Sequence, residues 1–277
     1  NYSVLDDNRE IAYLMRIRWG LKLQSFGRND FVRMDNFLGA LNMVQSELLE
    51  DSVLSRKAPD FFESYSKYID NLEENKLLTF ALMISRVVKH LREKPETLSH
   101  VKHLVVDEFQ DINQAQHEFI RLIAGKDNIF IVGDPRQSIY QWRGSDQNFF
   151  EVFSETFEGA KTVSIQKNRR STKKIVRNAN WFSDSFEVLR VRHLDPTRDR
   201  GGFVGFAELE TDVDEATWIA DQIGRLRDEK DLSYSDFGVL TRSVSYSAGH
   251  LIEELNRRGI PYIVGGKVGL FRRDEAQ

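Results

Sequence analysis

Two apolar runs in this chain each end abruptly in acidic residues. The first run, His103 to Val106, leads into Asp107-Glu108-Phe109-Gln110-Asp111, and the second, Asn128 to Val132, leads into Gly133-Asp134. Short apolar runs of this kind are typical of buried parallel strands. We therefore predict two strands of an α/β sheet that place carboxylates at its carboxyl edge, where open sheets of this class bind ligands.

Two adjacent acids at a strand end suit a nucleoside triphosphate site. One carboxylate, Asp107, would hold Mg²⁺ through water, and its neighbour Glu108 would orient or deprotonate the attacking water. Strands also often end in acids that are merely solvated. The pair alone therefore leaves both interpretations open.

The block from Gly133 to Gly144 favours the functional interpretation. Gln137 is placed to sense a phosphate by hydrogen bonding. Tyr140 and Trp142 offer planar faces on which an unpaired base stacks, at ~1–3 kcal/mol per base, and Arg143 can pair with a phosphate or stack in turn. Taken singly these are ordinary core aromatics and a surface charge, but together, directly after an acidic strand end, they indicate a binding site.

Three segments in order resemble motifs II, III and IV of the UvrD/Rep/PcrA family of superfamily 1 DNA helicases: Asp107 to Asp111, Gly133 to Gly144, and Gln166 to Thr172. The resemblance extends more loosely over nearly the whole chain. It implies an α/β fold: part of a RecA-like (P-loop NTPase) parallel-sheet domain, with an N-terminal helical subdomain and the start of a second RecA-like domain.

The resemblance also implies roles at the nucleotide. Asp107 is similar to the acid that coordinates Mg²⁺, and Glu108 to the general base for water attack on the γ-phosphate. Gln137 resembles the γ-phosphate sensor. Arg170 resembles the arginine finger, a group worth ~10³–10⁵ in rate in other phosphoryl-transfer enzymes.

Further residues are implied to contact the base of the nucleotide and the nucleic acid. Tyr140, Trp142 and Arg143 look like the residues that bind single-stranded DNA. Arg169 stands where the family usually carries a tyrosine that faces adenine. Its planar guanidinium can still stack on a purine, so the resemblance leaves adenine selectivity open.

By resemblance, the intact protein is an ATP-dependent DNA helicase or translocase of DNA repair type that moves 3′-to-5′. ATP and Mg²⁺ are its implied cofactors, and single-stranded DNA and duplex junctions its implied partners. Two alternatives remain. One is the helicase part of an AddA/RecB-type helicase–nuclease, whose motif III often contains Gly-Asp-Pro as at Gly133 to Pro135 here. The other is a non-catalytic DNA-binding module.

The sequence contains no phosphate-binding loop of the form G-x-x-x-x-G-K-[ST]. Gly265-Gly266-Lys267 is the nearest match, but no Ser or Thr follows its lysine. Counterparts of the family's motifs V and VI are also missing. We expect an internal fragment of a longer helicase that is inactive alone, in preference to a natural protein with a decayed ATPase, because the implied catalytic residues are retained.

The formal net charge is −4, which does not itself indicate a nucleic-acid binder. However, residues 161–177 hold seven Lys or Arg and no acid. This run is either a phosphate-facing surface or the solvated face of a helix. The absence of cysteine excludes disulfides and thiolate metal sites in this sequence. Apolar runs are far shorter than the ~20 residues that span a bilayer, so we expect a cytoplasmic protein, nucleoid-associated in a prokaryote.

The periodicity of apolar residues divides the chain into three parts. Residues 1–95 form a helical subdomain, 96–195 the C-terminal part of the first RecA-like domain, and 202–277 the beginning of the second, with a linker at 191–202. Predicted strands are 103–106, 129–132, 162–166, 203–209, 237–241 and 262–264, and the predicted helices that alternate with them are 114–124, 172–186, 213–228 and 248–258. Asp30, Asp60 and Asn113 are the expected helix caps.

Overall fold

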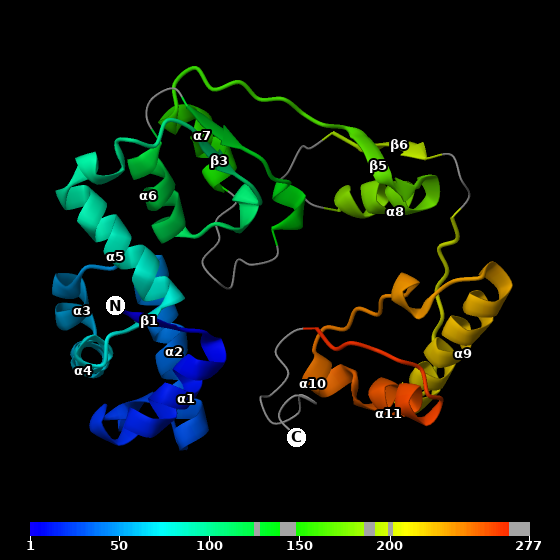
Figure 1. Cartoon of the computed structure of the whole chain (residues 1–277), viewed down its shortest axis with the longest axis horizontal. Helices are drawn as coiled ribbons and strands as arrows, with labels where there is room; N and C mark the ends of the chain where they lie inside the picture. The colour runs from blue at the N-terminus through cyan, green and yellow to red at the C-terminus, as the bar shows by residue number, and fades with distance from the viewer. Residues whose placement is uncertain (125–127, 139–147, 186–191, 199–201, 266–277) are drawn as a thin grey trace. The chain divides into compact units, whose positions relative to one another are not determined.

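The computed structural model describes residues 1–124, 128–138, 148–185, 192–198 and 202–265. The chain divides into two compact units, Asn1–Gly201 and Gly202–Gln277, each described here by itself (Figure 1). The predicted division between the helical and α/β parts near residue 95 lies inside the first unit and stays a prediction.

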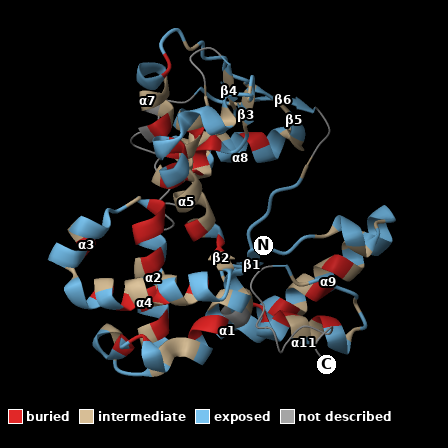
Figure 2. Ribbon diagram, turned by 60° about the vertical axis from the view of Figure 1, so that its left-hand side comes forward, coloured by how far each residue is buried: buried red, intermediate tan, exposed pale blue. Residues whose placement is uncertain are grey.

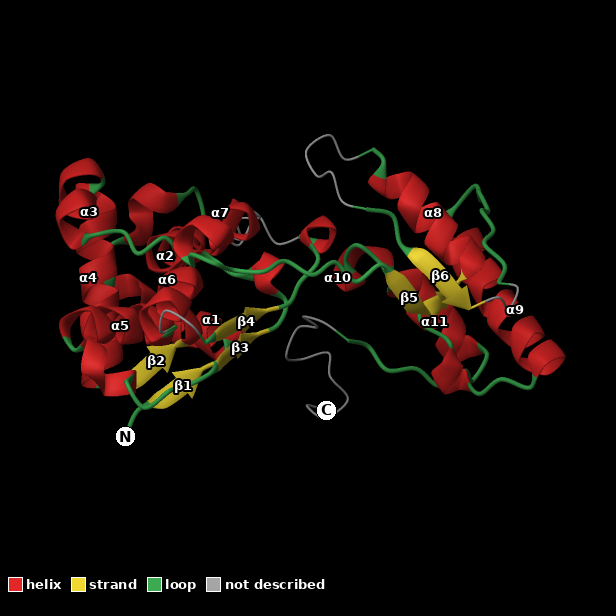
Figure 3. Ribbon diagram, turned by 90° about the horizontal axis from the view of Figure 1, so that it is seen from above, coloured by secondary structure: helices red, strands yellow, loops and turns green. Residues whose placement is uncertain are grey.

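The first part of unit 1 is mainly helical. Its helices are α1 (Asp7–Ile17), α2 (Asp30–Ser46), α3 (Asp51–Lys57), α4 (Pro59–Glu74) and α5 (Phe80–Glu93). A short parallel pair, β1 (Ser3–Leu5) with β2 (Leu77–Thr79), brings the segment before α1 beside the segment before α5 (Figure 3). Single 3₁₀ turns lie at Arg18–Gly20, Leu23–Phe26, Pro95–Leu98, Phe109–Asp111, Pro135–Gln137 and, in unit 2, Tyr234–Asp236.

Packing of aromatic and aliphatic side chains between α1, α2 and α4 holds this part together. Phe37 and Tyr68 are fully buried and their rings meet edge to face, 5.8 Å apart. The Tyr68 hydroxyl donates to Glu10 Oε1 at 2.9 Å, which satisfies its polar atom inside the core. The buried residues along α2 are visible in Figure 2.

Two predicted helix caps are wrong. The side chain of Asn29, not Asp30, caps α2 by accepting a hydrogen bond from Val32 N at 3.0 Å. The helix α4 begins at Pro59, whose missing N–H needs no cap, and Asp60 follows inside the first turn. The sequence pattern cannot separate neighbouring cap candidates, because the cap is the last residue with non-helical backbone before the helix.

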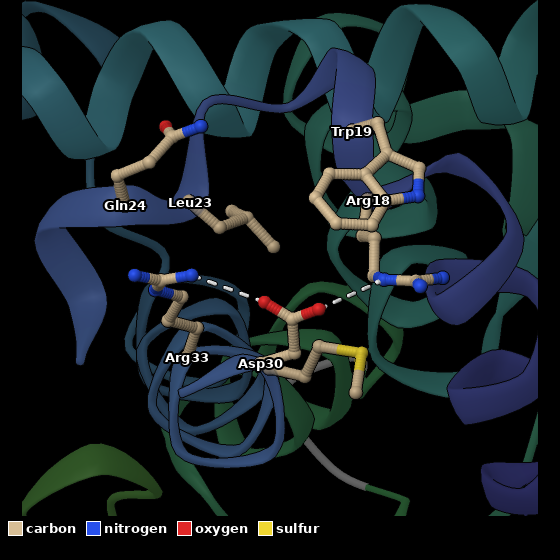
Figure 4. Close-up of a pocket in the computed structure, with 7 residues that line it drawn as sticks. Arg18, Trp19, Leu23, Gln24, Asp30 and Arg33 are labelled. Atoms are coloured by element: carbon tan, nitrogen blue, oxygen red, sulfur yellow. Dashed lines mark hydrogen bonds and ion pairs between the residues drawn. The ribbon is translucent and has the colours of Figure 1, made fainter. Parts of the chain in front are cut away.

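Asp30 instead lies between two arginines (Figure 4). Its carboxylate accepts from Arg18 Nε at 3.4 Å and from Arg33 Nη1 at 3.0 Å. The hollow beside it, also lined by Trp19 and Gln24, has a volume of about 20 Å³. That space holds about one water molecule, so this hollow is too small for a nucleotide.

The α/β part of unit 1 begins with β3 (Leu104–Val106), which pairs in parallel with β4 (Ile129–Ile131). Between them runs α6 (Gln114–Ile123), and α7 (Asn148–Thr156) follows β4. Asn113 caps α6 in a reciprocal capping box with Gln116, as predicted. The predicted strand–helix–strand order is confirmed in this region.

One face of the β3–β4 pair is buried and the other is open. Phe109 is fully buried against Phe150 and Phe153 on the side of α6 and α7. On the opposite face, Val105 is 70% exposed and Phe130 62% exposed. In the described residues the predicted buried strands are thus covered on one face, by α6 and α7, and the other face is exposed.

A second parallel pair, β5 (Lys167–Thr172) and β6 (Asp195–Arg198), packs against α8 (Lys173–Ser183). The predicted strand at 162–166 is wrong, since the ladder starts where Asp195 N donates to Gln166 O at 2.8 Å. β6 also falls inside the predicted linker. Both strands are polar, and backbone ladders form independently of side-chain polarity, so an apolar pattern could not locate them.

Unit 2 contains α9 (Asp212–Lys230), α10 (Val244–Ser247) and α11 (Gly249–Arg257). α9 and α11 pack through small and aliphatic residues such as Ala220 and Leu255, and the predicted helices there are confirmed. The predicted strands at 203–209, 237–241 and 262–264 are wrong: these segments have no ladder in the described residues. Most of their apolar side chains are exposed, and their backbone groups lack the ladder partner that a strand needs.

The fold class is α/β with short parallel strand pairs, as predicted. Among the helices that the structure describes, none combines the length and apolarity of a membrane span.

A buried ion-pair group connects α5 to α6. Glu118 is 8% exposed and accepts from Arg121 Nε at 2.6 Å and from Arg92 Nε at 3.0 Å. The hydrogen bond from Arg121, supported by Arg92, lowers the pKa of Glu118 despite the opposing effect of burial. The charged form of Glu118 therefore stabilises the junction between the helical and α/β parts.

We predict that Phe37→Ala lowers the free energy of unfolding of unit 1 by about 3–5 kcal/mol, because it leaves a cavity in a packed core. Phe31 lies on the same helix but is 77% exposed, so Phe31→Ala changes stability by no more than about 0.5 kcal/mol. Urea unfolding followed by circular dichroism compares the two variants. Equal losses would contradict the assigned core.

We predict that wild-type stability falls as the pH drops below about 4.5, the ordinary pKa of glutamate, because Glu118 has a depressed pKa when folded. Its contribution is complete above that pH and is lost as the pH falls through the folded-state pKa. Glu118→Gln removes this step and lowers stability at pH 7 by about 1–3 kcal/mol. Thermal unfolding between pH 3 and 7 measures it, with exposed Glu93→Gln as control.

Candidate functional site

The carboxyl ends of β3 and β4 are joined by backbone hydrogen bonds. Val132 N donates to Val106 O at 2.8 Å, and Phe109 N donates to Val132 O at 3.0 Å. Asp107 and Glu108, between these two bonds, are both exposed. The strand ends thus present two carboxylates to solvent at the edge where we predicted them.

Glu108 has a left-handed backbone with φ of 52°. This region disfavours residues with a Cβ, and such conformations gather at functional sites. The turn is held by Glu108 N donating to Asp107 Oδ1 at 2.9 Å and by Asp111 N donating to Glu108 O at 2.9 Å. It leaves the two acids at the surface while the next residues, Phe109 and Gln110, enter the core.

The buried side chain of Gln110 connects the two strand ends. Its Nε2 donates to Glu108 Oε2 at 2.7 Å, and its Oε1 accepts from Asp134 N at 3.0 Å. Only 2% of Gln110 is exposed, so the amide end of each bond is shielded from competing water. The amide therefore holds the carboxylate of Glu108 at a defined position relative to the turn after β4.

Asp134 continues the connection to Gln137. Its carboxylate accepts from Arg136 Nε at 3.1 Å and from Gln137 Nε2 at 3.0 Å. Burial raises the pKa of Asp134, but these hydrogen bonds outweigh it, so the pKa lies below its usual value. Glu108, Gln110, Asp134 and Gln137 thus form a continuous hydrogen-bonded series, which we call the Gln110 relay.

Gly133 leaves room for the Gln110 relay. A Cβ at this position would lie 2.4 Å from Gln110 Oε1, 2.7 Å from Phe150 Cζ and 3.1 Å from Phe109 N. No side chain fits without moving the amide or the backbone. The glycine of the turn after β4 is thus required by close packing beneath the two acids.

The predicted site residues fall into three groups. The Gln110 relay brings Gln137 to the same sheet edge as Asp107 and Glu108. Arg169 and Arg170 lie on β5, which pairs with β6 in a separate sheet. No hydrogen bond or ion pair among the described residues joins these arginines to the acids. Tyr140, Trp142 and Arg143 lie outside the described residues.

The backbone around Arg169 and Arg170 is shaped by Asn168. Its Oδ1 accepts from Arg170 N at 3.1 Å and from Ser171 N at 2.8 Å. The β5–β6 register shifts between Asn168 and Thr172. Both arginine side chains are exposed, which leaves their guanidinium groups accessible to an anion.

Sequence reasoning missed Gln110, Gly133 and Asp134 as organising residues. The available signal was a glutamine placed between a core aromatic residue and an acid directly after a strand, a position where a side chain turns inward. Asp111 is a further group of note: its Oδ1 is buried with no partner among the described residues, and burial, then the charge of Glu108, raises its pKa.

The exposed acids fit Mg²⁺ bound together with a nucleotide. Mg²⁺ takes oxygen ligands and is commonly held by one or two carboxylates plus phosphates and waters. Asp107 and Glu108 provide this number of carboxylates. Within the described ranges, no group of three or more acids, histidines or cysteines gathers as an all-protein metal cage.

Comparison with known proteins places the chain in a family. A model of the UvrD/REP helicase N-terminal domain matches residues 27–158, and a model of the UvrD-like helicase C-terminal domain matches residues 163–277. The chain is 31% identical over 284 residues to DNA helicase II of Haemophilus influenzae. It is 30% and 28% identical, each over 286 residues, to the ATP-dependent DNA helicases PcrA of Staphylococcus epidermidis and Bacillus subtilis.

These alignments cover 99% of this chain and 38% of each of the three relatives. With two helicase domains matched in order and acids, glutamine and arginines in the corresponding motifs, the chain belongs to the UvrD/Rep/PcrA family of superfamily 1 helicases. The resemblance drawn from the three motifs is thereby confirmed. The chain spans well under half the length of the curated relatives it matches.

We predict that Gly133→Ala displaces Gln110 and lowers the free energy of unfolding, by about 1–3 kcal/mol, because the new methyl group overlaps buried atoms. Gly39→Ala is the control. Gly39 is exposed on α2 with no atom near its Cβ position, and alanine there raises stability by about 0.5–1 kcal/mol. Urea unfolding measures both. An unchanged or raised stability for Gly133→Ala would contradict the described packing.

Proposed function

We propose that this chain provides the hydrolytic acids and part of the DNA-binding surface of an ATP-dependent DNA helicase or translocase. The observation that carries the proposal is the Gln110 relay, which positions Glu108 beside Asp107 and connects it to Gln137. The names of the relatives, ATP-dependent DNA helicase PcrA and DNA helicase II, support the same activity.

In this proposal Glu108 takes a proton from the water that attacks the γ-phosphate, and Gln110 holds its carboxylate in place. Asp107 would hold Mg²⁺ through water, and the bound ion would neutralise charge on the nucleotide phosphates. Arg170 supplies positive charge to the transferring phosphoryl group. Arg169 stacks on the base of the nucleotide.

The nucleic-acid half of the proposal rests on the segment after Gln137. Gln137 senses the γ-phosphate and donates a hydrogen bond to Asp134, which lies three residues before it. Tyr140 and Trp142 stack on bases of single-stranded DNA, and Arg143 assists. A change at the γ-phosphate would then reach the DNA contacts through a short stretch of backbone.

The finer details also belong to the proposal. We propose movement 3′-to-5′ on single-stranded DNA at duplex junctions, inside the cell and in DNA repair. The resemblance of the three motifs to those of the family supports these details. The phosphate-binding loop needed for hydrolysis is not in this sequence, so its lysine must come from elsewhere in the working enzyme.

We predict that Glu108→Gln in the complete natural protein lowers DNA-stimulated ATP hydrolysis by about 100-fold or more, because it removes the general base. The affinity for ATP stays within about threefold, since glutamine keeps the shape and the hydrogen-bonding oxygen. Steady-state phosphate release and binding of a fluorescent ATP analogue measure the two quantities. Glu96→Gln, an exposed acid outside the site, is the control, and undiminished hydrolysis by Glu108→Gln would overturn the proposal.

A further inference from the structure

Among the residues that the structure describes, the cations of residues 161–177 have no ion-pair partner. None of these seven side chains forms an ion pair with any described residue, and all seven are exposed: Lys161, Lys167, Arg169, Arg170, Lys173, Lys174 and Arg177. Elsewhere in the described chain most arginines on helices have an acidic partner three or four residues away or on a neighbouring helix. A run of free cations is therefore a local property of β5 and α8.

On α8 these cations share one face with an aromatic ring. Lys173, Arg177 and Trp181 are spaced four residues apart, so they lie on the same side of the helix, about 6 Å apart along its axis. Lys174 flanks this row. Val176, beside this row on the same helix, is 1% exposed and faces the core. We call Lys173, Lys174, Arg177 and Trp181 the α8 stripe.

The α8 stripe is unfavourable for the helix itself. Cations in the first turn oppose the helix dipole, whose positive end lies there, and no acid compensates for them. Trp181 is 77% exposed, although burial of an indole ring is strongly favourable. A merely solvated helix face requires neither feature, which favours the phosphate-facing interpretation of the basic run.

We propose that the α8 stripe is a binding site for single-stranded nucleic acid. Lys173, Lys174 and Arg177 contact successive phosphates, and Trp181 stacks on an unpaired base. The positive charge of the stripe favours a polyanion. The exposed ring favours a polyanion whose bases are free to stack, and in a duplex the bases are already stacked on one another. The site uses residues other than Tyr140, Trp142 and Arg143 and requires no ATP hydrolysis. Its test is therefore independent of the proposed catalytic mechanism.

The first test follows Trp181 directly. In the full chain, Trp19, Trp142 and Trp218 are replaced by phenylalanine, which leaves Trp181 as the single tryptophan. Titration with an oligothymidine quenches its fluorescence if a base stacks on the ring. Heparin, a polyanion without bases, competes for the cations but leaves the emission unquenched. No quenching by oligothymidine, or equal quenching by heparin, would overturn the proposal.

The second test measures the phosphate contacts. Lys173→Gln with Arg177→Gln makes the slope of log binding constant against log salt less negative by about 1.4, the value for two phosphate contacts on a single strand. Arg56→Gln with Lys57→Gln is the matched control, because these exposed cations end α3 and should leave the slope unchanged. Equal slopes for the stripe variant and wild type would count against the site.

The third test separates the α8 stripe from the proposed DNA site. Trp181→Ala weakens oligothymidine binding by at least about fivefold, the lower limit for losing one stacked base. In a Trp142→Ala background the same factor is expected, because independent contacts add. Circular dichroism confirms that each variant is folded. Unchanged affinity of folded Trp181→Ala, or duplex DNA bound as tightly as the single strand, would overturn the proposal.

Discussion

The hydrogen bonds of one buried amide, that of Gln110, determine the geometry on which the candidate site depends. An amide has both a donor and an acceptor, and burial makes it costly to leave either unpaired. Gln110 satisfies both by donating to Glu108 and accepting from the backbone of Asp134. The ends of β3 and β4 are thereby held in one arrangement, with the acids outside and the amide inside. Gly133 is a consequence, because only a residue without a side chain leaves space for the amide.

Charged residues in the structure have two different environments, one buried and paired and the other exposed and without a partner. Glu118 is buried between Arg92 and Arg121 and connects two helices, so its charge serves the fold. The cations of β5 and α8 have no such partner among the described residues and lie exposed. In the same way, Phe109 is an internal ring, while Trp181 is left at the surface. Arginines and aromatic rings thus support the fold where they are paired or buried, and are free to bind a ligand where they are exposed without a partner.

Much of the fold could be predicted because it depends on local patterns. The helices α6, α9 and α11 and the strands β3 and β4 follow from apolar periodicity and from a cap such as Asn113. The polar strands β5 and β6 could not be located in this way, because their ladder uses backbone groups that every residue shares. The apolar segment around Phe206 was predicted as a strand for its side chains, but it is 91% exposed and unpaired in the described structure. Strand formation depends on a partner distant in the sequence.

The sequence by itself determined the class of fold, the family and the identity of the acids, the glutamine and the arginines of the candidate site. These follow from motifs, which consist of particular residue types at short spacing in the sequence. Only the tertiary structure decided which groups support them. The bonds of Gln110, the close approach at Gly133 and the isolation of the cations on α8 each join or separate residues through space. Such relations depend on burial and on partners far along the chain, which no local pattern records.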